Sequence, residues 1–129
     1  MIQLILHLIG DYVTQSDWMA QNKAKHSLPA MAHALVYSLP FLFLTAHAPN
    51  PAIAGTVILV THFLIDRYRL ARYVVFAKNF LSPNNYPKWE DCKATGYPSE
   101  RPAWLAVWLL IAADNTLHLA INWAALKWL

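Results

Sequence analysis

Histidine and aspartate recur four residues apart inside the most apolar segments of the chain, and this pairing constrains the fold more than any other feature. The three pairs are His7 with Asp11, His62 with Asp66, and Asp114 with His118. Residues four apart on a helix lie on the same face, one turn from each other. We therefore expect each segment to form a helix that is apolar around most of its circumference and carries one narrow polar stripe.

The composition favours a membrane protein. Hydrophobic residues make up 57% of the 129 residues and charged residues only 13%, about half of the usual charged share of about 25%. Four apolar segments predict helices at about residues 2–21, 29–47, 52–79 and 102–127. A membrane-spanning helix needs about 20 apolar residues, and the first segment is the weakest because it contains Asp11 and Asp17. It could instead lie partly in the membrane interface.

Polar stripes on membrane helices turn inward, away from lipid. The expected fold class is therefore all-α: a single integral membrane domain over residues 1–129, built as a four-helix transmembrane bundle with a polar His/Asp-rich centre. Tryptophans near the two ends of the last segment are typical of an aromatic belt. They are Trp104, Trp108, Trp123 and Trp128.

Basic residues occupy alternate loops. Lys23 and Lys25 lie between the first and second segments, seven further Lys or Arg residues lie between His62 and Pro102, and the 47–52 connection has none. Under the positive-inside rule the basic loops, including the long loop 80–101, are cytoplasmic. A basic chain can also bind nucleic acid, but this alternation is a topology signal, so we expect no nucleic-acid partner. We interpret the loop 80–101 as a solvated basic loop rather than a lid.

Seven ionisable side chains inside the apolar segments are candidate metal ligands: His7, Asp11, His33, His62, Asp66, Asp114 and His118. An ionised Asp at the centre of a membrane helix costs roughly 2.5–3.5 kcal/mol on insertion scales. A divalent metal offsets this cost because it binds ionised carboxylate and neutral imidazole. The nitrogen-rich set favours zinc, with manganese or iron as alternatives. Seven ligands exceed one tetrahedral site, so either two metals bind or some side chains orient the others.

Four stretches carry a resemblance to a known family: HLIGDYVTQSDWMAQNK, AHALVY, HFLIDRYRLARY and DNTLHL. They resemble a family of small bacterial and phage membrane proteins catalogued as domain of unknown function 3307. The family pattern is H-x-x-G-D-[FY]-x-x-Q, a helix-two His, H-F-x-x-D and D-[QN]-x-x-H, and it falls in all four segments. The resemblance carries over position by position to His7, Gly10, Asp11, Gln15, His33, His62, Asp66, Asp114 and His118.

Asn115 stands where many members of that family have Gln, a departure that leaves the neighbouring Asp/His pair intact. The resemblance implies a multi-pass protein of the bacterial inner membrane and confers no activity. In their general pattern of His and Asp on apolar helices, these segments are also similar to membrane-bound metal-dependent hydrolases related to an inner-membrane LexA-binding protein.

The sequence favours a metal-dependent hydrolase that acts near the cytoplasmic membrane surface. A bound metal lowers the pKa of its water and polarises the bond that is attacked. The candidate catalytic carboxylates are Asp11, Asp66 and Asp114, of which one that is not a ligand would be the general base. Arginine binds phosphate bidentately, so a phosphoester or anionic lipid is the expected substrate. The candidate substrate-binding residues are Arg67, Arg69, Arg72 and Gln15.

Two other classes of function stay open. The polar centre can be a structural metal site or a hydrogen-bond network in a protein that acts through a partner. It can also be an ion or proton pathway. The apolar stretches FLFLTA and GTVILV argue against this, because such a pathway needs polar side chains that continue to both membrane faces. Besides the lipid bilayer, a homo-oligomeric partner is compatible with the sequence.

Overall fold

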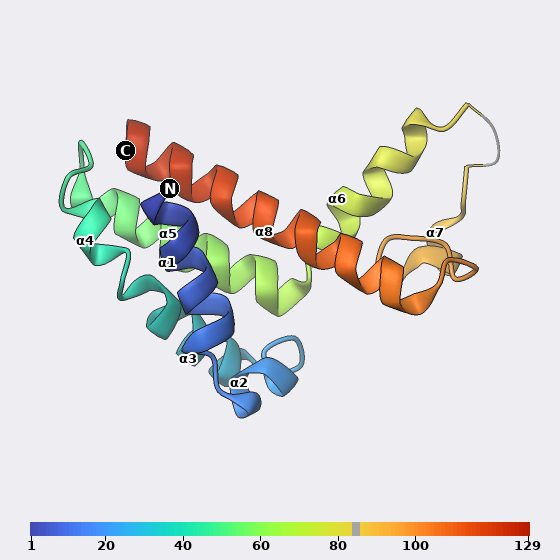
Figure 1. Cartoon of the computed structure of the whole chain (residues 1–129), viewed down its shortest axis with the longest axis horizontal. Helices are drawn as coiled ribbons and strands as arrows, with labels where there is room; N and C mark the ends of the chain where they lie inside the picture. Colours follow the sequence, from blue (N-terminus) through green and yellow to red (C-terminus); the bar gives the residue numbers. More distant parts are fainter. Residues whose placement is uncertain (84–85) are drawn as a thin grey trace. The chain divides into compact units, whose positions relative to one another are not determined.

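The computed structural model describes residues 1–83 and 86–129, and every regular element in this part of the chain is helical. The all-α class is therefore confirmed. The elements are α1 Ile2–Leu8, the π-helix η1 Ile9–Val13, α2 Asp17–Asn22, α3 Ser27–Ser38, α4 Leu42–Thr45, α5 Pro51–Tyr68, α6 Ala71–Ala77, the 3₁₀-helix η2 Lys78–Leu81, α7 Trp89–Cys92 and α8 Ala103–Trp128 (Figure 1).

The first two predicted helices are each interrupted. The segment 2–21 breaks before Ser16, whose backbone is extended and whose hydroxyl accepts a hydrogen bond from the Met19 N–H at 3.4 Å. Serine in this conformation caps a new helix, α2, rather than continuing the old one. The segment 29–47 ends its long helix at Ser38, because Pro40 has no backbone N–H to continue the helical hydrogen bonds.

The third predicted helix, 52–79, breaks at Arg69, which has a φ of 53°. A non-glycine residue in the left-handed region cannot continue an α-helix, so α5 ends at Tyr68 and α6 begins at Ala71. Only the fourth prediction, 102–127, corresponds to one continuous helix, α8.

The chain divides into two compact units, and the division falls at the Arg69 break and within α8. The first unit comprises residues 1–68 and 118–129. In it α3 packs along α5, while η1 and α2 pack against α3 (Figure 1). Tyr37, Phe41, Ile58 and Ala125 form its buried apolar core.

The second unit comprises residues 69–117, and Val75, Tyr97 and Ala106 form its core. Gly96 has a φ of 82°, and a Cβ placed there would lie 2.3 Å from the Arg72 carbonyl oxygen. The predicted loop 80–101 falls in this unit. Its residues 84–85 lie outside the described part of the chain, and the remainder includes the short helix α7.

Within the described residues, α8 is the one helix that is long and apolar enough to cross a membrane. The shorter apolar stretch Ile2–Val13 falls below that length. By length and composition, then, one span is supported, and the four-helix transmembrane bundle stays a prediction.

The π-helix η1 brings its backbone against an aromatic ring. A Cβ added to Gly10 would lie 2.5 Å from the Tyr37 Cδ2 atom, whereas a Cβ added to Gly55 in α5 would meet nothing within 4 Å. Single-turn π-helices occur frequently at functional sites, and this one places Asp11 directly after the contact. Only a residue without a side chain allows this approach.

We expect Gly10→Ala to destabilise the protein by about 1–3 kcal/mol, because the added methyl group overpacks the Tyr37 ring. The matched control is Gly55→Ala, which should be neutral or stabilising by up to about 1 kcal/mol because alanine is the better helix former. Chemical denaturation of both variants in detergent measures the difference. Equal stability of the two variants would contradict the packing role of Gly10.

Candidate metal centre

Four buried side chains converge in the first unit: Asp11 from η1, His33 from α3, and His62 and Asp66 from α5. Each offers one ligand atom, and these atoms lie within 4.8 Å of one another. The two imidazoles have no exposed surface, and the two carboxylate residues are each 7% exposed. The i, i+4 spacing on α5 aims both of its side chains into the same centre.

The distances between these ligand atoms are short and nearly equal. The Nε2 atom of His33 lies 3.2 Å from Asp11 Oδ1 and 3.2 Å from Asp66 Oδ2. The Nε2 atom of His62 lies 3.4 Å from Asp11 Oδ1 and 3.3 Å from Asp66 Oδ2. The two Nε2 atoms are 3.0 Å apart.

These five distances are close to the edge length of a tetrahedron of the size that zinc requires. Ligand bonds of about 2.0–2.1 Å place tetrahedral ligand atoms about 3.3–3.4 Å from one another. Hydrogen bonding by itself does not account for the arrangement. An imidazole nitrogen has a single in-plane proton or lone pair, yet the Nε2 atom of His33 has two carboxylate oxygens and a second imidazole nitrogen around it.

The outer nitrogens of the two central histidines lack the partners that metal-binding histidines usually have. The Nδ1 atoms of His33 and His62 are buried and have no hydrogen-bond partner among the described residues. In the form of histidine that binds a metal through Nε2, the proton resides on Nδ1 and is usually donated to a carboxylate or carbonyl oxygen. The case for a metal therefore rests on the distances at Nε2.

A chain of hydrogen bonds from α8 to η1 positions His7 and, through it, Asp11. The Asn122 Nδ2 group donates to the Tyr37 hydroxyl at 2.7 Å, and that hydroxyl lies 2.8 Å from Nδ1 of His7. With the hydroxyl accepting from Asn122, its own proton goes to His7. The proton of His7 then resides on Nε2, which lies 3.4 Å from Asp11 Oδ2. His7 therefore orients Asp11 from the side opposite the centre.

Tyr37 also shapes the centre by stacking. Its ring lies 3.6 Å from the His62 ring, centroid to centroid, at an interplanar angle of 14°. The same side chain thus contacts Gly10, donates to His7 and holds the plane of His62.

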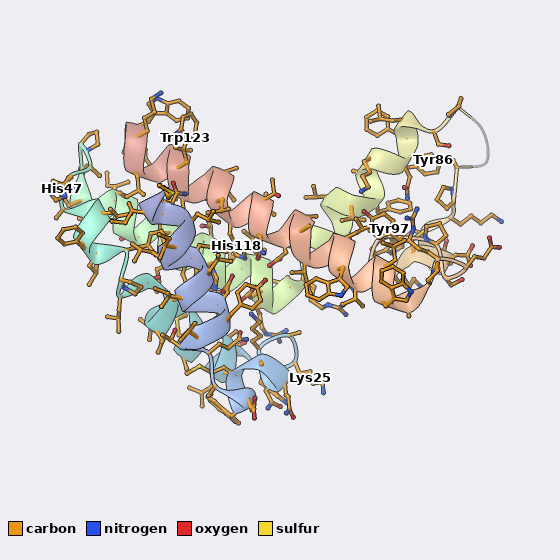
Figure 2. The ribbon with its side chains drawn as sticks, viewed as in Figure 1. Lys25, His47, Tyr86, Tyr97, His118 and Trp123 are labelled. Atoms are coloured by element: carbon orange, nitrogen blue, oxygen red, sulfur yellow. The ribbon has the colours of Figure 1, made fainter. Side chains whose placement is uncertain are left out.

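His118, labelled in Figure 2, extends the cluster from α8. Its Nε2 atom lies 3.6 Å from Asp66 Oδ1, the oxygen that faces away from His33 and His62. Asp114 lies one turn earlier on α8, in the part of the helix that belongs to the second unit. Six of the seven predicted ligands are therefore brought together in the first unit, and the role of Asp114 stays a prediction.

Lys23 is the member of this cluster that sequence reasoning missed. Its ammonium lies 2.8 Å from Asp66 Oδ2 and 3.2 Å from Nε2 of His33. From the sequence, Lys23 is interpreted only as one of two basic residues in a predicted cytoplasmic loop. No spacing pattern links it to residues 33 and 66, because only the packing of α2 against α3 brings it there.

The three predicted substrate-binding arginines donate to backbone carbonyl oxygens, and a substrate-binding role for them and for Gln15 stays a prediction. Arg67 donates to the Ala24 carbonyl oxygen at 3.0 Å, beside the loop that carries Lys23. Arg69 and Arg72 lie in the second unit and donate to the carbonyl oxygens of Ala94 and Lys93. Gln15 is half-buried, and its Oε1 atom has no hydrogen-bond partner.

An all-helical protein with a buried His/Asp centre is the class that this geometry defines. The model of the family described as Protein of unknown function (DUF3307) matches residues 1–126. The chain belongs to that family, and the resemblance noted from the sequence motifs is confirmed. Neither the comparison with curated proteins nor the comparison with solved structures gives a match.

We expect Tyr37→Phe to destabilise the protein by about 1–3 kcal/mol, because it leaves the buried polar groups of His7 and Asn122 without their shared hydroxyl. Tyr68→Phe is the control, since Tyr68 is exposed and its substitution should change stability by less than about 0.5 kcal/mol. Denaturant unfolding of both variants measures the effect. If Tyr37→Phe is as stable as the control, the hydrogen-bond chain does not hold His7.

Proposed function

We propose that this protein is a membrane-embedded, metal-dependent hydrolase whose metal centre is formed by Asp11, His33, His62 and Asp66. The observation that carries the proposal is that five of the six distances among four buried ligand atoms lie between 3.0 and 3.4 Å. Two carboxylates and two imidazoles suit zinc first, and manganese or iron next. His7 and His118 contact the outer carboxylate oxygens, as partners that orient metal ligands do.

Hydrolysis at such a centre would need a further coordination position for water, because four protein ligands complete a tetrahedral site. A divalent metal supplies a water of lowered pKa and polarises the bond to be attacked. The protein's side chains would hold the ligands rigid through Tyr37 and Asn122, and would exclude bulk water by burial. Asp114 is the remaining candidate general base.

The surface of the first unit supports membrane embedding. Large apolar side chains on α3, α4, α5 and the connection between α3 and α4 face outward, and large exposed apolar areas mark membrane or protein contacts. They are Leu35, Leu39, Leu42, Phe43, Ile53 and Val60. On α8 the exposed tryptophans at both ends are those expected of an aromatic belt. A bundle that is apolar outside and polar within is suited to lipid.

A second candidate function has its own support. The Lys23 ammonium at 2.8 Å from Asp66 Oδ2 already supplies a counter-charge inside the cluster. This favours, as the alternative, a non-enzymatic membrane protein whose polar centre is a structural network and which acts through a partner. Metal content separates the two candidates.

The purified wild-type chain is expected to hold about one zinc ion per molecule when it is isolated with zinc. His62→Ala and Asp66→Ala should each lose that zinc, because each removes a ligand atom. His47→Ala is the matched control: His47 is exposed, and its Nδ1 hydrogen bonds to the Phe43 carbonyl oxygen of α4. Elemental analysis of detergent-purified protein measures the content.

The same samples test hydrolysis. A chromogenic phosphoester should be cleaved by the zinc-loaded wild-type chain, lose cleavage after chelation and regain it when zinc is restored. Absence of zinc, manganese and iron from the wild-type protein rules out the metal centre. Zinc that is bound without any cleavage favours the structural alternative.

Membrane embedding predicts that the protein stays in the pellet when membranes are washed with alkaline carbonate, and enters solution only with detergent. Transfer of apolar surface from lipid to water costs roughly 25 cal/mol of free energy for every Å², so the alkaline wash alone should not extract the protein. Immunoblots of the two fractions, with a peripheral membrane protein as control, give the result. Release by carbonate alone would leave no membrane-spanning role for α8.

A further inference from the structure

Lys23 differs from every other member of the cluster in its access to solvent. Its side chain is 22% exposed, whereas those of Asp11 and Asp66 are 8% and 5% exposed and those of the central histidines are fully buried. It belongs to the short connection between α2 and α3. Its ammonium therefore lies where the buried centre opens toward the surface.

With a divalent metal bound, the metal and Lys23 would together carry three positive charges, against two negative charges on Asp11 and Asp66. The ammonium and a divalent cation would both be attracted to Asp66 Oδ2, from which Lys23 Nζ is 2.8 Å away, and would repel each other. An anionic ligand that contacts both cations removes this repulsion. Lysine binds phosphate as a point charge.

Further positive charge lies beside the same opening. Arg67 directly follows Asp66, donates from Nη1 to the Ala24 carbonyl oxygen at 3.0 Å, and donates from Nε to Ser27 Oγ at 3.3 Å. Its guanidinium is thereby held against the α2–α3 connection. Lys25 extends from that connection into solvent (Figure 2). An approaching anion would meet a positive potential at this connection.

We propose that Lys23 is the anion-binding group of the metal centre, and that the ligand it receives is a phosphate-type oxyanion. This inference rests on the proposed metal centre and names the class of ligand for it. Lys23 pairs with Asp66 while no ligand is bound, and turns to the oxyanion when the metal occupies Asp66.

The test is isothermal titration of the zinc-loaded full-length chain, in a non-ionic detergent, with inorganic phosphate and separately with a short-chain phosphatidic acid. Lys23→Met should weaken phosphate binding by about 10- to 100-fold, the range of a hydrogen bond to a charged group. Lys25→Met, which removes an equal charge two residues away, should leave phosphate binding unchanged. Lys23→Met should hold zinc at least as tightly as the wild type, because a competing cation is gone.

Lys23→Gln provides a second variant, which keeps a polar side chain and removes the charge, in case the methionine variant does not fold. Loss of binding for either probe in the Lys23 variants supports the inference, and the probe affected identifies free phosphate or a lipid headgroup as the source. Unchanged affinity for both probes, or zinc binding weakened by Lys23→Met, overturns it. Absence of zinc, manganese and iron from the wild-type chain is a different result, which overturns the metal centre itself.

Discussion

Two carboxylates, Asp11 and Asp66, are almost completely removed from solvent, and the negative charge that they carry has to be balanced inside the first unit. The helices of this unit are arranged around that requirement. Residues from η1, α3 and α5 bring two imidazole nitrogens to within 3.2–3.4 Å of the carboxylate oxygens, while Lys23 adds a positive charge from the end of α2. Without this compensation, burial of the two charges would cost several kcal/mol for each ion.

The surroundings of the centre act through a small number of contacts that serve more than one purpose. Tyr37 stacks on His62, lies against the backbone of Gly10 and connects Asn122 of α8 to His7. A glycine within a π-helix allows the close approach on one side. Because these contacts share one aromatic side chain, the geometry of the ligand atoms and the packing of the core cannot vary independently.

Much of the candidate site was predictable from the sequence because it depends on helical periodicity. The spacing of His62 and Asp66, and of His7 and Asp11, places each pair on one helix face whatever the rest of the fold does. Helix continuity was less predictable. The breaks at Ser16 and Arg69 depend on a cap and on a left-handed residue. In the sequence, these local signals for a helix end are weaker than the signal for a continuous helix that a long apolar segment gives.

The sequence by itself determined that the protein is helical and that polar stripes of His and Asp lie on apolar helices, since both follow from local spacing. Tertiary structure alone decided which charges meet. Lys23 lies 43 residues from Asp66 in the chain, yet their side chains are 2.8 Å apart. Arg69 and Arg72, although close to Asp66 in sequence, belong to a different unit. Contacts between helices depend on how their surfaces pack, and no periodicity within one helix contains that information.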